Sequence, residues 1–321
     1  MVEPRPSVSV AIPVYNGAAH LERCLAAIAV QTYENICEVL VVDGSSSDGT
    51  RELVAATPLV RVVDNPRRNR PAAMNIALAE AAGDVIVRVD GRTFIAPDYV
   101  ERCVVALGAS QATIVGGPMR LTAETARQRG IRAAMMSKLG GGPAEFRRDR
   151  GGARYVDTVY LGAFYRDAIT AIGGYDEVFG GNEDAELAYR AQQADGVYLD
   201  PAIHSSYAVR DGFGALWTQY VRYGRARAGT IRKHPGSLAP RQLVVPAFFV
   251  ALASPWQRPV LAAYSVAIVG RSVQHGRVDR AAAIPMMLAF PTMHLAWGVG
   301  FAKGFARRRR PEADADAKSG R

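Results

Sequence analysis

Four acidic residues of this chain stand where a carboxylate could do chemistry. Asp43 and Asp90 end the apolar runs ICEVLVVD and DVIVRVD, and Glu183 and Asp184 lie side by side at the start of a helical pattern. An ionised carboxylate can accept hydrogen bonds, bind a hard divalent cation or take a proton from an attacking hydroxyl. Which of these uses applies depends on the elements that hold the four side chains.

Strand and helix patterns alternate through the first 120 residues. Apolar strand-like runs cover 7–14, 36–43, 59–65, 84–90 and 112–121, and stretches with helical spacing separate them. This alternation predicts an α/β protein with an open, mostly parallel sheet and helices on both faces. Ligands of such sheets bind outside the carboxyl ends of the strands. We therefore expect Asn16, Asp43 and Asp90 to meet at one edge.

The later part of the chain is less regular. A strand is expected over 156–166, a helix from Glu183 to about residue 193, and an amphipathic helix over 213–234. The first strand is followed by PVYNGAAH, which lacks the G-x-G-x-x-G turn of dinucleotide-binding dehydrogenases. The absence of this turn argues against a dinucleotide-dependent dehydrogenase.

The charge of the chain is concentrated near its C-terminus. The net charge is +9 over 321 residues, and the segment from Arg241 onward holds 12 Lys or Arg against 4 Asp or Glu. Since that segment is also the most apolar, its charge indicates a membrane surface and not nucleic acid. The four arginines at 307–310 favour a cytoplasmic C-terminus.

The apolar C-terminal segment has several possible structures. Residues 281–302 are about as long as one bilayer span requires. The stretch 243–270 carries Arg258 at its middle, so we consider two short interfacial segments or a bent pair more favourable than a single span there. A buried helical hairpin of a soluble protein is the remaining alternative.

Four motifs in order, PVYNG, VVDGSSSDGT, RVDG and GGYDEVFGGNED, resemble those of the family 2 glycosyltransferases, which are inverting enzymes with the Rossmann-like GT-A fold. NEDAELAYR and the residues 205–229 are similar to the exopolysaccharide branch of that family. The resemblance covers roughly residues 8–229. It implies a catalytic domain over 1–240, with a nucleotide-sugar half (1–120) and an acceptor half (121–240). A membrane-associated helical region (241–306) and a basic, disordered tail (307–321) complete the expected organisation.

The resemblance implies that the donor, a UDP-sugar, binds at the strand ends and the following helix. Tyr15 would lie against the base, and Asp43 would accept hydrogen bonds from a uracil imide or a ribose hydroxyl. Arg70 and Asn75 would help to hold the diphosphate or ribose. The expected donor-binding residues are Pro13, Tyr15, Asn16, Asp43, Arg70, Asn75, Asp90 and Arg92.

Family members place D-x-D or D-x-H where this chain has Asp90 and Arg92. The resemblance implies that Asp90 binds a divalent metal, Mg²⁺ or Mn²⁺, which bridges the donor phosphates. A guanidinium cannot ligate a metal, but it can hold phosphate oxygens. Either Arg92 replaces part of the missing positive charge, or it points elsewhere and His204 supplies the second metal ligand.

The resemblance assigns the catalytic base to Asp184, and Glu183 is expected to orient the loop or the acceptor. The helix N-terminus favours an ionised Asp184, whereas the neighbouring Glu183 and Glu186 raise its pKa. QYVRY at 219–223 resembles the Q-x-x-R-W element of processive members, with Gln219, Arg222 and Tyr223 near the acceptor or the diphosphate. The missing Trp favours transfer of a single sugar.

The sequence thus predicts a membrane-associated inverting glycosyltransferase, cytoplasmic in its catalytic part, that acts on a lipid-linked saccharide acceptor. A polyprenyl-phosphate sugar synthase is the alternative among enzymes. A non-catalytic nucleotide-sugar-binding membrane scaffold is the alternative from another class.

Overall fold

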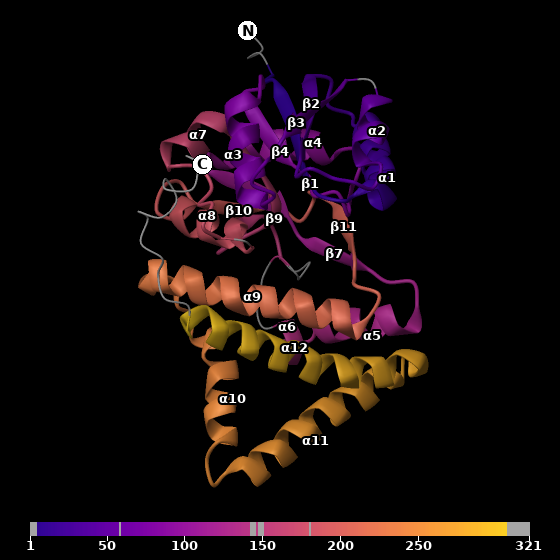
Figure 1. The fold of residues 1–321 in the computed structure, drawn as a ribbon, viewed down its shortest axis with the longest axis vertical. Coiled ribbons are helices and arrows are strands. Elements are labelled where there is room, and N and C mark those ends of the chain that lie inside the picture. Colours follow the sequence, from indigo (N-terminus) through magenta and orange to yellow (C-terminus); the bar gives the residue numbers. More distant parts are fainter. Residues whose placement is uncertain (1–4, 58, 142–145, 147–150, 180, 307–321) are drawn as a thin grey trace, which may run out of the picture.

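The computed structural model describes residues 5–57, 59–141, 146, 151–179 and 181–306 (Figure 1). The expected disordered tail lies outside these residues. The larger sheet has the strand order β3-β2-β1-β4-β9-β6-β10-β8, and a small sheet has the order β5-β11-β7. The strands are β1 (Val8–Val14), β2 (Ile36–Asp43), β3 (Val60–Asp64), β4 (Val85–Arg88), β5 (Thr93–Ile95), β6 (Ile114–Gly117), β7 (Met119–Thr122), β8 (Arg154–Tyr155), β9 (Tyr160–Tyr165), β10 (Val197–Leu199) and β11 (Ser205–Ala208).

Helices cover both faces of the larger sheet, as predicted. Helices α1, α2 and α4 pack on one face, and α3, α7 and α8 pack on the other. Successive residues of β2 alternate between these two cores, because side chains of a strand point to opposite faces. These helices are α1 (Ala18–Ala29), α2 (Thr50–Ala55), α3 (Arg70–Glu80), α4 (Tyr99–Ser110), α7 (Arg166–Ala171) and α8 (Glu183–Ala191).

The sheet departs from the sequence prediction at two places. The expected fifth strand, 112–121, is divided at Pro118 into β6 and β7, which belong to different sheets. At Gly117 the chain runs so close to Ile203 that a Cβ atom would lie 1.8 Å from the Ile203 carbonyl oxygen. Strand β9 inserts between β4 and β6 and is antiparallel to both, so the sheet is mixed at its centre.

The remaining helices lie beneath the sheet in Figure 1. They are α5 (Ala126–Met136), α6 (Lys138–Gly141), α9 (Phe213–Lys233), α10 (Val244–Leu252), α11 (Gln257–Gly276) and α12 (Arg280–Ala306), with short 3₁₀ turns at Pro235–Ser237 and Pro240–Gln242. Helix α12 lies along α9 and α5 and buries one apolar face against them.

Glycines allow α9 and α12 to approach closely. A Cβ atom on Gly224 would lie 2.0 Å from the Trp297 carbonyl oxygen, and one on Gly300 would lie 2.1 Å from the Val221 carbonyl oxygen. Both distances are shorter than any real contact, so only glycine fits. The two helices are therefore locked together at this crossing.

The stretch 243–270 forms a bent pair, one of the structures expected from the sequence. Helices α10 and α11 extend away from the sheet and meet at a corner, so that they form a triangle with α12 in Figure 1. We call α10 and α11 the wing. Among the described helices, α12 alone is long and apolar enough to cross a membrane, and a third of its apolar window is buried inside the protein.

Candidate active site

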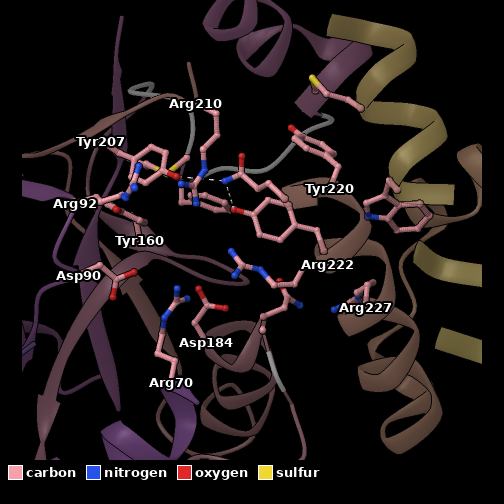
Figure 2. A pocket seen from close by; sticks show the side chains of 18 of the residues that line it. Arg70, Asp90, Arg92, Tyr160, Asp184, Tyr207, Arg210, Tyr220, Arg222 and Arg227 are labelled. Carbon is pink, nitrogen blue, oxygen red and sulfur yellow. Dashed lines mark hydrogen bonds between the residues drawn. The ribbon is translucent and has the colours of Figure 1, made fainter. Parts of the chain in front are cut away.

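A cavity of about 1100 Å³ lies at the carboxyl ends of β1 and β4 and extends down to the wing. Asp90, Arg92, Asp184 and Arg222 line one part of it, and Figure 2 shows these side chains around a common space. The strand ends and the start of α8 thus converge, as the sequence predicted. Asp90 and Asp184 share one cavity although 94 positions separate them in the chain.

Arg88 holds Asp90 in place from beneath. Its Nε atom lies 3.0 Å from Asp90 Oδ1, and its side chain is only 2% exposed. Burial favours the neutral form of Asp90, but Arg88 and then Arg70 outweigh that effect and lower its pKa. Asp90 is therefore an ionised carboxylate at neutral pH that lines the cavity.

Glu183 is the buried counter-ion of two arginines and does not line the cavity. Its Oε1 atom lies 3.1 Å from Arg88 Nη2 and 3.3 Å from Arg70 Nη1. Burial raises the pKa of Glu183, but Arg70 and Arg88 reverse the shift, so its pKa is lowered. Since Glu183 cannot touch a ligand in the cavity, it acts as a positioning residue for Arg88 and Arg70.

Asp184 faces the cavity at the first turn of α8. Its Oδ1 atom accepts a hydrogen bond from the Ala185 amide at 2.8 Å. Burial and the adjacent Glu183 raise its pKa, although Arg88 and Arg70 act in the opposite direction. A raised pKa makes the carboxylate a stronger base. Glu186 contributes differently from expectation, because the cations of Arg190 and Lys233 already neutralise it.

The first strand end contributes Pro13, Tyr15 and Asn16 to the cavity. Tyr15 is 56% exposed, so its ring is available to a ligand. Asp43 is only 1% exposed and does not line the cavity. Its carboxylate accepts hydrogen bonds from the Ser46 amide, at 3.1 Å, and from the Ser46 hydroxyl, and so fixes the loop that follows β2.

Two further expected site residues, Asn75 and His204, lie outside the cavity, as Asp43 and Glu183 do. The Asn75 amide exchanges 2.8 Å hydrogen bonds with the backbone of Tyr175 and donates to Glu177, which ties α3 to the loop before α8. His204 Nε2 lies 2.8 Å from Arg120 Nη2 and must accept that hydrogen bond, since a guanidinium only donates.

Strand register explains the position of His204. Tyr207 pairs with Thr93, next to the Asp90 turn, whereas His204 precedes Ser205 at the far end of β11. Three residues of extended strand separate His204 from Tyr207 by roughly 10 Å. Among the described residues, no group of three or more His, Cys, Asp or Glu side chains could hold a metal ion.

Helix α9 provides the third wall, with Gln219, Arg222 and Tyr223 lining the cavity. The buried Gln219 amide donates to the hydroxyls of Tyr223, at 2.9 Å, and Tyr207, at 3.3 Å, and so joins α9 to β11. Arg222 runs alongside Gly181 at the start of the NED segment. The QYVRY element thus reaches the same cavity as Asp90 and Asp184.

Cations without a neighbouring carboxylate surround this part of the cavity. In the described part of the chain, Arg92, Arg210 and Arg222 all line it, and none has an acidic side chain within ion-pair distance. Figure 2 shows Arg92 and Arg210 at one side of the space and Arg222 at another. This arrangement suits a ligand with several negative charges.

The sequence interpretation did not identify Arg88 or Arg210. Arg88 carried a signal, because a cation inside the apolar run DVIVRVD requires buried acidic partners. Its partner Glu183 is 95 residues away, so the sequence could not identify the pair. Arg210 lies in a loop after β11, and nothing in its sequence neighbourhood distinguishes it from a surface arginine.

The fold and the site define a glycosyltransferase with the GT-A architecture. The family model Glycosyl transferase family 2 matches residues 9–168. The chain is 33% identical over 307 residues to the succinoglycan biosynthesis protein ExoA of Rhizobium meliloti (strain 1021), a match that covers 91% of this chain and 93% of that protein. The chain therefore belongs to glycosyl transferase family 2.

Other similarities are more distant. The glycosyltransferase AglE of Haloferax volcanii is 34% identical over 128 residues, which cover 38% of this chain and 42% of that protein. The mannosyltransferase PcManGT from Pyrobaculum calidifontis, in complex with GDP-Man and Mn²⁺, has a TM-score of 0.61 at 21% identity over 96% of this chain and 89% of that one. S. aureus TarS 1–349 in complex with UDP has a TM-score of 0.51 at 13% identity, over 95% and 94%. These structures support the fold.

Proposed function

We propose that this chain is an inverting glycosyltransferase that transfers a single sugar from a nucleotide-diphosphate donor, a UDP-sugar, to a lipid-linked saccharide. The observation that carries the proposal is the shared cavity of Asp90 and Asp184, which hold a low and a raised pKa respectively. Two carboxylates with opposite pKa shifts can serve charge stabilisation and proton transfer within one site. The similarity to a succinoglycan biosynthesis protein supports exopolysaccharide or cell-envelope glycan synthesis.

The residues of the cavity suit a single displacement. The acceptor hydroxyl oxygen attacks the anomeric carbon, and the bond from that carbon to the diphosphate oxygen breaks. Asp184 takes the hydroxyl proton, and the raised pKa favours that transfer. Arg92 and Arg210 face the negative charge that develops on the departing diphosphate.

Donor binding is assigned to the strand ends. Tyr15, 56% exposed, would lie against the base, and Asn16 and Pro13 line the same edge. Asp43 would act through the loop that its carboxylate fixes, since that carboxylate is buried beneath Ser46. Asn75 would act in the same indirect manner, by fixing the loop before α8.

A divalent cation fits this cavity with one carboxylate as its protein ligand. Mg²⁺ and related ions are commonly held by one or two carboxylates together with substrate phosphates. Asp90 is ionised and would be the protein ligand, because His204 is committed to Arg120. Bound there, the ion would neutralise part of the leaving diphosphate, and Arg92 would supply charge where relatives supply a second ligand.

Membrane association is supported by the wing, whose outer surface is apolar. Val250 of α10 and Trp256, which lies between α10 and α11, are each more than 70% exposed. We place the catalytic domain on the cytoplasmic side of the cell membrane. This agrees with the cytoplasmic C-terminus that the four arginines at 307–310 favour. An acceptor carried by a membrane lipid could then reach the cavity without leaving the bilayer.

The decisive experiment is transfer of radiolabelled sugar to extractable lipid by membranes that contain the protein. Membranes are supplied with UDP-sugars and GDP-mannose, and Asp184→Asn is compared with Asp167→Asn, a control whose side chain is 95% exposed. We expect label only with an active protein, loss in Asp184→Asn and no loss in Asp167→Asn. Absence of transfer with all donors would refute the proposal.

The same assay tests the polyprenyl-phosphate sugar synthase. A phosphate acceptor needs little deprotonation, so Asp184→Asn would then retain most of its activity. The labelled product would also carry one sugar on a lipid phosphate, which mild acid hydrolysis and chromatography distinguish from an extended saccharide.

A further inference from the structure

The cavity does not end at the catalytic carboxylates. Its lower part is lined by Val244, Val245 and Phe248 of α10, Tyr264 of α11, and Met293 and Trp297 of α12. We call this part the apolar arm. A volume of about 1100 Å³ is shared by the catalytic part and the apolar arm. A pocket that binds one small ligand usually has a volume of roughly 300–1,000 Å³.

The helix that borders the arm is unusual for a folded protein. Helix α10 has the sequence VVPAFFVAL, and none of its residues is buried. Apolar side chains left in contact with water raise the free energy of the folded state, by about 25 cal/mol per Å². One side of α10 faces outward, with Val250 72% exposed, while Val245 and Phe248 face the cavity. Both sides therefore require an apolar partner.

Ring contacts and hydrogen bonds connect the helices that form the walls of the arm. The rings of Phe248 and Tyr264 contact each other with their centroids 4.9 Å apart and their planes tilted by 41°. The Tyr264 hydroxyl lies 2.9 Å from His294 Nδ1, and His294 Nε2 lies 2.8 Å from the Leu139 carbonyl oxygen. These two hydrogen bonds pair the Tyr264 hydroxyl and both ring nitrogens of His294. The arm thus presents a largely apolar surface in which these polar groups are already paired.

Cations stand between the arm and the catalytic carboxylates. Arg222 and Arg227 both project from α9 into the cavity, as Figure 2 shows. Arg227 also donates to the Ser237 carbonyl oxygen, so it is held near the base of the arm. A ligand that matches both features has an anionic head and a hydrocarbon tail.

We propose that the apolar arm binds the prenyl chain of a prenyl phosphate or diphosphate, with the phosphate at Arg222 and the chain between α10, α11 and α12. This inference rests on the proposed function, since it gives a place to the lipid of the acceptor. The saccharide head would extend from Arg222 toward Asp184. The continuity of the arm with the catalytic part allows one ligand to occupy both.

The test measures binding of radiolabelled farnesyl diphosphate to the full chain in mild detergent, with competition by inorganic diphosphate and by lysophosphatidate, a single-chain acyl phosphate. We expect farnesyl diphosphate to bind at least tenfold more tightly than inorganic diphosphate. Val245→Trp should remove this difference, because the larger ring fills the arm. Val266→Trp, at a position that is 72% exposed and outside the cavity, should preserve it.

Each outcome bears on the proposal. Equal affinity for farnesyl diphosphate and inorganic diphosphate, or an unaffected Val245→Trp variant, would overturn it. Tighter binding of lysophosphatidate than of farnesyl diphosphate would assign the arm to acyl lipids and also overturn it. Nucleotide-induced thermal shifts, measured in each variant, report folding and donor binding separately. A chain that transfers sugar but lacks prenyl selectivity would refute the arm alone, whereas prenyl binding without any transfer would refute the proposed function.

Discussion

Replacement of Arg88 by Met should destabilise the protein by an amount that the structure allows us to estimate. Arg88 is 2% exposed and Glu183 0% exposed, and their 3.1 Å contact is shielded from water. Removal of one partner of a buried ion pair costs about 3–5 kcal/mol, because the other charge remains buried without compensation. We expect Arg88→Met to lower the free energy of unfolding by an amount in that range, even though Arg70 still contacts Glu183.

The double variant Arg88→Met/Glu183→Leu should recover much of this loss. Apolar residues of similar volume often replace a buried ion pair without a cost. We expect a coupling energy of about 2–3 kcal/mol between the two positions. Sugar transfer should not recover, since Asp90 has lost the 3.0 Å hydrogen bond that orients it. Stability and activity thus separate in one variant.

Urea unfolding followed by circular dichroism measures these free energies. Arg102→Met is the matched control, because Arg102 is 47% exposed and its partner Asp98 is 39% exposed. Exposed ion pairs contribute about 0–1 kcal/mol. If Arg88→Met cost no more than Arg102→Met, or if the double variant were as unstable as the sum of the single variants, our account of the buried pair of Arg88 and Glu183 would be wrong.

Three further predictions concern the base, the metal and the wing. Asp184→Asn should lower transfer about 10²–10⁴-fold and raise thermal stability at pH 7. The stability gain follows because folding raises the pKa of Asp184, so the wild-type protein loses stability as pH rises above the pKa that Asp184 has in the unfolded chain. Since the base must be ionised to accept a proton, the wild-type rate should increase with pH until Asp184 is ionised. Arg92→His should make activity more dependent on Mn²⁺, measured by chelator titration, whereas Arg92→Ala should weaken donor binding. Gly300→Leu should destabilise the chain by about 1–3 kcal/mol, because the new side chain overlaps the Val221 carbonyl, whereas Gly270→Leu, with open space around it, should not.

The strand and helix patterns of the sequence were sufficient to predict which strand ends lie at the site. The carboxyl ends of β1, β2 and β4 had to lie at one edge, because parallel strands align their ends. Asp90 and Asn16 reached the cavity for that reason. Asp184 followed from the start of a helical pattern, although its distance to Asp90 depended on β9, whose antiparallel insertion the repetition did not predict.

Tertiary contacts decided what the sequence could not. Asp43 meets the same criteria as Asp90, yet the Ser46 loop covers it. His204 was a reasonable metal ligand until strand register placed it beside Arg120. The hydropathy of 281–302 is equally consistent with a lipid or a protein environment. The contacts of Gly300 with Val221 and of Gly224 with Trp297 show that α12 packs on α9.

The glycine crossing between α9 and α12 has a mechanical consequence. Since Gly224 and Gly300 leave no room for a sliding layer of side chains, α12 cannot shift along α9 without a clash of backbones. Helix α12 must therefore move with α9 as one rigid piece. If the triangle of α10, α11 and α12 is the part that enters the leaflet, α12 fixes the distance between the bilayer and the catalytic carboxylates. The enzyme would then select glycans by how far their growing end stands from the membrane.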